Sequence, residues 1–301
     1  MPSPLQCIPW LVVLGTECLT TVILNVIIII AFVKQRQPLR RSKYLIIHQA
    51  IVDLLVGLVF GPLMIERRGS FSCDLWDYRR PDITWLLILE NVLGLQVYQV
   101  SLLNLAVISL ERVHATFRPF KHRFIKKWVY GVIITIIWLV PTVMNSILSG
   151  IVPYTFFFIY HPIIVFAFYF TLLFVVVVCY TSICLKVRCN RLPRHHGAAG
   201  VRERKLTSTL LLVTFGSLIT FLPKIVFWGL WLPSPKPVFN LYIWLPFDYS
   251  MIVITFVVAN SLINPIIYAI RMPEVRTSIF LIIFRRARNP INPIDIPLQN
   301  L

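Results

Sequence analysis

Seven runs of apolar residues, each long enough to cross a lipid bilayer, constrain what this 301-residue chain can fold into. A membrane-spanning helix needs about 20 mostly apolar residues, and its backbone must bond internally because the bilayer core holds no water. Segments such as 26–32 do not alternate between polar and apolar residues, as the strands of a β-barrel would. We therefore expect an all-α membrane protein, a seven-transmembrane helix bundle. The expected helices lie at 10–33, 44–65, 83–111, 128–149, 156–185, 206–231 and 241–270.

The 29 Lys and Arg residues are distributed unevenly between the apolar runs. Most of them lie in every second linker, at 34–43, 112–127 and 186–205, and in the tail after residue 270. Cytosolic loops of membrane proteins are enriched in Lys and Arg. The pattern therefore predicts a multi-pass protein of the plasma membrane, with an extracellular N-terminus and a cytosolic C-terminus. It also explains the formal charge of +17 without a nucleic acid partner.

The residues after the seventh run indicate a short helix on the inner surface. Segment 273–286 combines an early proline, an apolar face and flanking arginines, which favours an amphipathic cytosolic helix in contact with membrane lipids. A frayed basic tail is the alternative. The proline-rich residues 287–301 are expected to be disordered. Residues 1–286 then form a single membrane domain.

Polar side chains within the apolar runs predict a buried pocket, since such groups need partners inside a helix bundle. Pro265 should kink the seventh run, and Asn264 directly precedes it. If the polar faces converge, they bring one carboxylate together with hydroxyl and amide oxygens. This set suits Na⁺ or a proton on the carboxylate, and a plain hydrogen-bond network between helices is the alternative. The residues are Asp53, Ser101, Asn260, Ser261 and Asn264.

Charged residues at the cytosolic edge suggest a contact between the third and sixth runs. Glu111 and Arg112 end the third run, and Glu203 lies just before the sixth run on the same side. An arginine can make bidentate contacts with carboxylates of its own helix and of a neighbour. A pair between Arg112 and Glu203 would clamp these helix ends, and its release would open a cavity for a partner. The alternative is two ordinary snorkelling charges.

The outer halves of the third and sixth runs carry polar and aromatic residues that are typical of a ligand-binding cleft. Glu90 and Lys224 stand out, because each places a charge within a spanning segment. These two residues either contact a ligand or neutralise each other. The other candidate ligand-binding residues at this depth are Asn91, Tyr98, Trp228 and Tyr249.

Together these residues resemble the rhodopsin-like (class A) G-protein-coupled receptors, over about residues 10–286. Asn264-Pro265-Ile266-Ile267-Tyr268 is a full Asn-Pro-x-x-Tyr motif, and residues 109–113 are similar to the Asp/Glu-Arg-Tyr motif of that family. Phe221-Leu222-Pro223 is similar to its Cys-Trp-x-Pro motif, with phenylalanine in place of tryptophan. Single residues that match the family lie on the first, second, fourth and fifth runs, namely Asn25, Asp53, Trp138 and Tyr180.

The resemblance implies a receptor that binds an extracellular ligand and activates a heterotrimeric G protein through outward movement of the sixth helix. It makes Glu203 the acidic partner in the inactive-state clamp, and it brings Arg112 and Tyr180 together in the active state. It also assigns the pocket around Asp53 to an allosteric Na⁺ ion, with no other cofactor and no catalytic residue. The switch residues that it implies are Glu111, Arg112, Tyr180, Glu203, Phe221, Pro223, Asn264, Pro265 and Tyr268.

Departures from the family pattern bear on the ligand. The usual cysteine of the third helix falls on Leu87 and the linker between the fourth and fifth runs has none, so the common disulfide is absent. Cys7 and Cys73 are the two cysteines expected outside, where they could form a different bridge. The aspartate that binds biogenic amines falls on Gly94 in the cleft, which argues against a typical amine. The pattern is similar to melanocortin, cannabinoid, lysophospholipid and adenosine-type receptors, and favours a peptide, lipid or small-molecule ligand.

Other classes fit the sequence less well. A seven-helix transporter or channel would show broken helices at paired positions of two repeats, whereas Pro223 and Pro265 lie in successive runs of one half. The chain contains neither a His-Glu-x-x-His nor a Gly-x-Ser-x-Gly motif, so nothing suggests a membrane enzyme. A receptor relative that no longer signals is disfavoured because Arg112 and Tyr268 are retained.

Glu203→Ala should raise basal nucleotide exchange on the G protein, because it removes one half of the predicted clamp with Arg112. The measurement compares wild type and variant in membranes at matched surface expression. Equal basal exchange in the two would count against the clamp.

Overall fold

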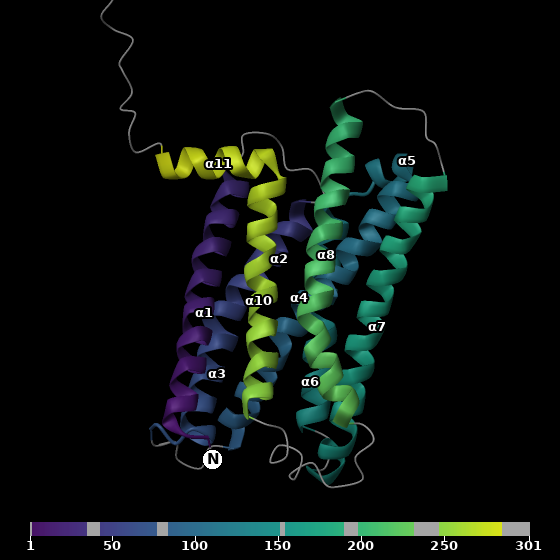
Figure 1. Cartoon of the computed structure of the whole chain (residues 1–301). Helices are drawn as coiled ribbons and strands as arrows, with labels where there is room; N and C mark the ends of the chain where they lie inside the picture. Colours follow the sequence, from purple (N-terminus) through teal and green to yellow (C-terminus); the bar gives the residue numbers. More distant parts are fainter. Residues whose placement is uncertain are drawn as a thin grey trace, which may run out of the picture.

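The computed structural model describes residues 2–34, 43–76, 84–150, 154–189, 198–231 and 247–284, with only the backbone described at several helix ends, including 84–95, 154–162 and 198–207. Within these residues all regular structure is helical, and seven spans are long and apolar enough to cross a membrane. The predicted all-α, seven-span membrane fold is thereby confirmed (Figure 1). The tail at 287–301, predicted to be disordered, lies outside the described residues.

Six of the spans are single helices: α1 (Pro4–Val33), α4 (Thr84–Phe117), α6 (Lys127–Gly150), α7 (Tyr154–Cys189), α8 (Ala198–Trp231) and α10 (Phe247–Arg271). The second span is a series of segments: α2 (Lys43–Leu55), the π-helical turn η1 (Val56–Phe60), α3 (Gly61–Arg67) and the π-helical turn η2 (Arg68–Ser72). Two further helices, α5 (Pro119–Arg123) and α11 (Pro273–Phe284), lie at one end of the bundle, and α11 runs across the end of α10 (Figure 1). We call this the α11 end, and the opposite end, where α1 begins, the N-terminal end.

Helices α4 and α10 are the central packing elements of the bundle. α4 packs against the second span, α6 and α7, and α10 lies between α1 and α8 (Figure 1). One cluster of buried side chains in the N-terminal half includes Tyr98 and Phe221, and another in the α11 half includes Ile108 and Tyr268. Large apolar side chains such as Phe174 of α7 are exposed on the outside, as a bundle surrounded by lipid requires.

Glycines let the first two spans approach each other closely. A Cβ atom added at Gly57 would lie 2.9 Å from the carbonyl oxygen of Cys18 and 2.9 Å from a methyl carbon of Val22. A Cβ atom added at Gly61 would meet the sulfur of Cys18. Small residues commonly mediate helix contacts in membranes, where burial of apolar surface gives little drive for association. The glycines of η1 and α3 therefore set the distance between α1 and the second span.

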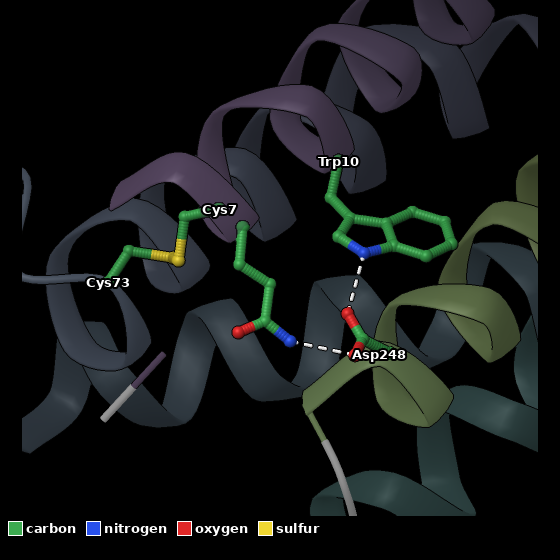
Figure 2. The surroundings of a disulfide bond; sticks show 5 residues. Cys7, Trp10, Cys73 and Asp248 are labelled. Carbon is green, nitrogen blue, oxygen red and sulfur yellow. Dashed lines mark hydrogen bonds between the residues drawn. A yellow bond between two sulfur atoms is a disulfide. The ribbon is translucent and has the colours of Figure 1, made fainter. Parts of the chain in front are cut away.

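Three contacts tie helix ends together at the N-terminal end. Cys7 of α1 and Cys73, just after η2, form a disulfide with their Cα atoms 6.0 Å apart (Figure 2). Trp10 Nε1 donates to Asp248 Oδ1 at 2.9 Å, and Gln6 Nε2 donates to Asp248 Oδ2 at 2.7 Å. Asp248 lies in the first turn of α10, where the helix dipole favours a carboxylate. α1 begins earlier than predicted because its proline-rich start fits a first helical turn, and the added turns carry these contacts.

Gly57→Ala should lower the melting temperature of the detergent-solubilised protein, because the new methyl group pushes α1 away from the second span. Overpacking of this kind costs about 1–3 kcal/mol, which corresponds to a fall of roughly 3–8 °C. The matched control is Gly131→Ala on α6, where an added Cβ meets nothing within 4 Å. The control should melt at the wild-type temperature or slightly above it. Equal falls in both variants would contradict the close packing.

Candidate functional site

Asp53 of α2 is fully buried at the place where three spans meet. Its Oδ1 accepts hydrogen bonds from Ser101 Oγ of α4 at 3.2 Å and from Ser261 Oγ of α10 at 2.9 Å. Its Oδ2 accepts a hydrogen bond from Asn264 Nδ2 at 2.8 Å. Four of the five residues predicted for the polar pocket thus lie together, namely Asp53 and the three residues that donate to its carboxylate.

Asn260, the fifth predicted residue, joins α10 to α8, since its Oδ1 accepts a hydrogen bond from Thr220 Oγ1 at 3.3 Å. The ring of Pro265 replaces an N–H, so the carbonyl four residues earlier, that of Ser261, loses its helical donor. Asn25 Nδ2 of α1 donates to this carbonyl at 3.1 Å. The proline thereby gives α1 a polar attachment to α10 next to the pocket.

A chain of buried polar residues that the sequence reasoning missed continues from Asp53 toward α6. Gln49 Nε2 donates to Asp53 Oδ1 at 3.0 Å, and Asn104 Nδ2 donates to Gln49 Oε1 at 2.7 Å. His48 Nδ1 lies 3.1 Å from Asn104 Oδ1, and Trp138 Nε1 donates to His48 Nε2 at 2.9 Å. A signal for this chain was present in the sequence, because Gln49 precedes Asp53 by four residues and therefore shares its helix face.

Arg112 of α4 is buried at the α11 end, with 1% of its surface exposed. Its guanidinium pairs with the preceding residue, since Nε donates to Glu111 Oε2 at 2.6 Å. Glu111 Oε1 lies 2.7 Å from Nε2 of His122 and accepts a hydrogen bond from the Tyr130 hydroxyl at 3.4 Å. Glu111 therefore joins α4 to α5 and α6, which no motif indicated. The side chain of Glu203 lies outside the described residues, so its pairing with Arg112 stays a prediction.

The two tyrosines assigned to the switch by resemblance are buried on α7 and α10. Tyr180 packs in a cluster with Ala106 of α4 and Val176, and Tyr268 belongs to the apolar cluster of the α11 half. Within the described part of the chain, the Tyr268 hydroxyl is buried without a hydrogen-bond partner. Leaving such a group without a partner is costly, and the role of Tyr268 as a switch residue stays a prediction.

A group of aromatic residues lies between α4, α7 and α8 in the N-terminal half. The rings of Tyr98 and Tyr169 stack with their centroids 5.9 Å apart, and the ring of Phe221 lies 6.3 Å from that of Tyr169. Lys224, nearly one turn beyond Phe221 on α8, places its Nζ 4.0 Å from the centre of the Tyr98 ring and 6.0 Å from that of Tyr169. The ammonium group therefore rests on aromatic faces, in a cation–π arrangement.

Tyr249 of α10 lies next to this group, because its hydroxyl donates to the carbonyl of Pro223 at 3.3 Å. The structure thus brings Tyr98 and Lys224 of the predicted cleft together, with Tyr249 bonded to the residue before Lys224. The remaining predicted ligand residues have side chains outside the described part of the chain: Glu90, Asn91, Gly94 and Trp228.

The seven spans and the polar residues along them define a membrane receptor of the rhodopsin type. A family model described as "7 transmembrane receptor (rhodopsin family)" matches residues 24–268. The chain therefore belongs to this family, which confirms the resemblance found in the motifs. Membership implies a receptor in the membrane rather than an enzyme.

The chain is similar to muscarinic acetylcholine receptors over part of its length. The M3 receptor of Bos taurus is 28% identical over 138 residues, which are 43% of this chain and 21% of that receptor. The M5 receptor of Rattus norvegicus is 28% identical over 141 residues, which are 44% of this chain and 24% of that receptor. The chain thus aligns with less than a quarter of the length of these relatives, and their ligand is not transferred by the similarity.

Proposed function

We propose that this protein is a G-protein-coupled receptor of the plasma membrane, with its N-terminal end outside the cell. The observation that carries the proposal is Arg112, a charged residue buried at the α11 end and held by Glu111 of its own helix. A charge buried in a spanning helix is costly and by default marks a functional residue. The excess of Lys and Arg in the linkers at the α11 end supports a cytosolic position for that end.

The proposed switch is a population shift between two packings of α8. In the packing described here, α8 contacts α7 and α10, and Arg112 is paired with Glu111. In the other packing, α8 moves outward at the α11 end and leaves Arg112 open to a heterotrimeric G protein. Pro223 supports a hinge within α8, because the proline ring removes one helical hydrogen bond. The carbonyl of Pro223 accepts a hydrogen bond from Tyr249 of α10, which ties this point of α8 to its neighbour.

Arg112→Ala should abolish nucleotide exchange on the G protein and leave surface expression largely intact, since Glu111 keeps His122 and Tyr130 as partners. Exchange is measured in membranes with a panel of heterotrimeric G proteins. Arg118→Ala is the matched control, because Arg118 is an exposed arginine near the same end. Exchange that persists in Arg112→Ala contradicts the proposed role. Silence of the wild type with every G protein would favour a receptor relative that no longer signals.

We also propose that the ligand carries an acidic group. Lys224 is a charged residue in a spanning helix, and among the described residues no carboxylate lies within ion-pair distance of it. Gly94 offers no carboxylate to an amine, whereas the relatives are named for acetylcholine, which is a cation. The rings of Tyr98 and Tyr169 offer apolar contact surface beside the ammonium group. A small organic or lipid acid therefore fits this site.

Lys224→Met should weaken the binding of acidic ligands by about 10–100-fold, since a hydrogen bond to a charged group contributes about 1.5–3 kcal/mol. The probes are 5-phenylpentanoic acid, its methyl ester and 5-phenylpentylamine, and the readout is the melting temperature of the purified receptor. The acid alone should stabilise the wild type. Lys186→Met is the matched control, because Lys186 also lies over a ring, 4.1 Å from the centroid of Phe117, but near the α11 end. Stabilisation of the wild type by the amine would contradict the proposed ligand class. Failure of the acid to stabilise the wild type would contradict it as well.

A further inference from the structure

The orientation of the polar chain beside Asp53 is fixed from its far end, at Trp138. An indole N–H can only donate, so Nε2 of His48, 2.9 Å away, must accept. The neutral imidazole ring then holds its proton on Nδ1 and donates it to Asn104 Oδ1 at 3.1 Å. A doubly protonated ring is incompatible with this contact, because two donors would face each other.

Asn104 and Gln49 are oriented in turn. With its oxygen engaged, Asn104 donates through Nδ2 to the carbonyl of Leu45 at 3.1 Å and to Gln49 Oε1 at 2.7 Å. Gln49 must then present Nε2 to the pocket, where it donates to Asp53 Oδ1 at 3.0 Å and to Ser101 Oγ at 2.6 Å. Flipping either amide would set donor against donor or acceptor against acceptor at two contacts or more.

The donors around Asp53 gather on one oxygen of its carboxylate. Each oxygen of an ionised carboxylate offers about two lone-pair positions. Oδ1 accepts hydrogen bonds from Gln49, Ser101 and Ser261, whereas Oδ2 accepts one, from Asn264. A serine hydroxyl can turn its hydrogen away and bind a cation through its oxygen. The amide of Gln49 cannot, because its N–H groups are held toward Asp53 Oδ1 and Ser101 Oγ while its oxygen accepts from Asn104.

Two acceptors of the pocket have room for a further contact: Asp53 Oδ2, and Asn264 Oδ1, which is buried and has no donor in the described part of the chain. On the side that Asp53 Oδ1 shares with Ser101, however, a cation would meet the N–H groups of Gln49 instead of an oxygen ligand. The residues present therefore do not fit the sodium site that the family resemblance implied.

We propose that the amide of Gln49 takes the place of a sodium ion beside Asp53, and that the stability of this receptor is independent of Na⁺ as a result. The amide donates to the carboxylate at all times, whereas an ion binds in proportion to its concentration. Gln49 is thus a positioning residue whose orientation is set through Asn104 and His48. The far end of this chain of polar residues is Trp138, which is half-buried on α6. Hydrogen bonds therefore connect the pocket to the outer side of the bundle.

The test is the melting temperature of the purified full-length receptor in NaCl and in N-methyl-D-glucamine chloride at equal ionic strength. We expect the wild type to melt at the same temperature in both salts. Gln49→Met keeps the size of the side chain and removes its donors, so it should gain a Na⁺-specific rise of about 2–5 °C. A second change, Asp53→Asn, should remove this gain. Gln96→Met is the matched control on α4, since it removes an amide that donates to Thr142 at 2.5 Å outside the pocket.

A Na⁺-specific rise in the melting temperature of the wild type that Asp53→Asn abolishes would overturn the proposal. This comparison needs no variant at residue 49. A folded Gln49→Met protein without any response to Na⁺ would overturn it as well, because the amide would then not be what keeps the ion out. Gln49→Leu serves as the second variant if Gln49→Met does not fold. The assay uses neither ligand nor G protein, so its outcome is separate from that of the proposed signalling function.

Discussion

A carboxylate inside a bundle surrounded by lipid has no bulk water to bind, so its donors must come from the protein. Asp53 collects them from its own helix, from α4 and from α10, and this requirement fixes the rotation of three spans about their axes. Pro265 adds a second requirement, since the carbonyl that it leaves unpaired is satisfied from α1. Apolar burial does little to select neighbours in hydrocarbon. These polar contacts, with the close approach at Gly57, therefore help decide which helices meet.

The spans could be predicted from the sequence because hydrocarbon leaves an apolar segment of about 20 residues little choice but a helix. Asp53 and Asn264 were found for the same reason, since such groups are costly outside a bundle. Gln49 was missed because it belongs to no motif, although its position four residues before Asp53 places it on the same helix face. The early start of α1 was missed because a proline-rich segment suits either a first helical turn or a loop, and contacts with distant residues, including the Cys7–Cys73 disulfide, favour the helix. No local feature of the sequence indicated the π-helical turns of the second span.

Two of the matches to the family pattern that bear on the switch lie in the α11 half of the molecule, and the departures that bear on the ligand lie in the N-terminal half. Arg112 and Tyr268, which match, lie in the α11 half, where a receptor of this family would meet its transducer. Phe221 and Lys224 of α8 lie in the N-terminal half, at the aromatic group, and Gly94 lies on α4 four residues before Tyr98 of that group. The two halves meet at the layer of Asp53. The proposed switch and the proposed ligand site thus depend on different residues, so the family can be assigned although the ligand of the relatives does not follow.

The Cys7–Cys73 disulfide joins residues 66 positions apart, and the loop that it closes contains only the first two spans. In the proposed orientation, with the N-terminal end outside, both cysteines would reach the oxidising lumen of the secretory pathway once the second span has been inserted. The bond can therefore form while the later helices are still being synthesised, since domains of a growing chain fold from the N-terminus onward. A covalently closed hairpin of two helices would then await α10, whose Asp248 completes the assembly by binding Gln6 and Trp10. The bridge would in this way fix the pairing of the first two spans before α10 packs against them.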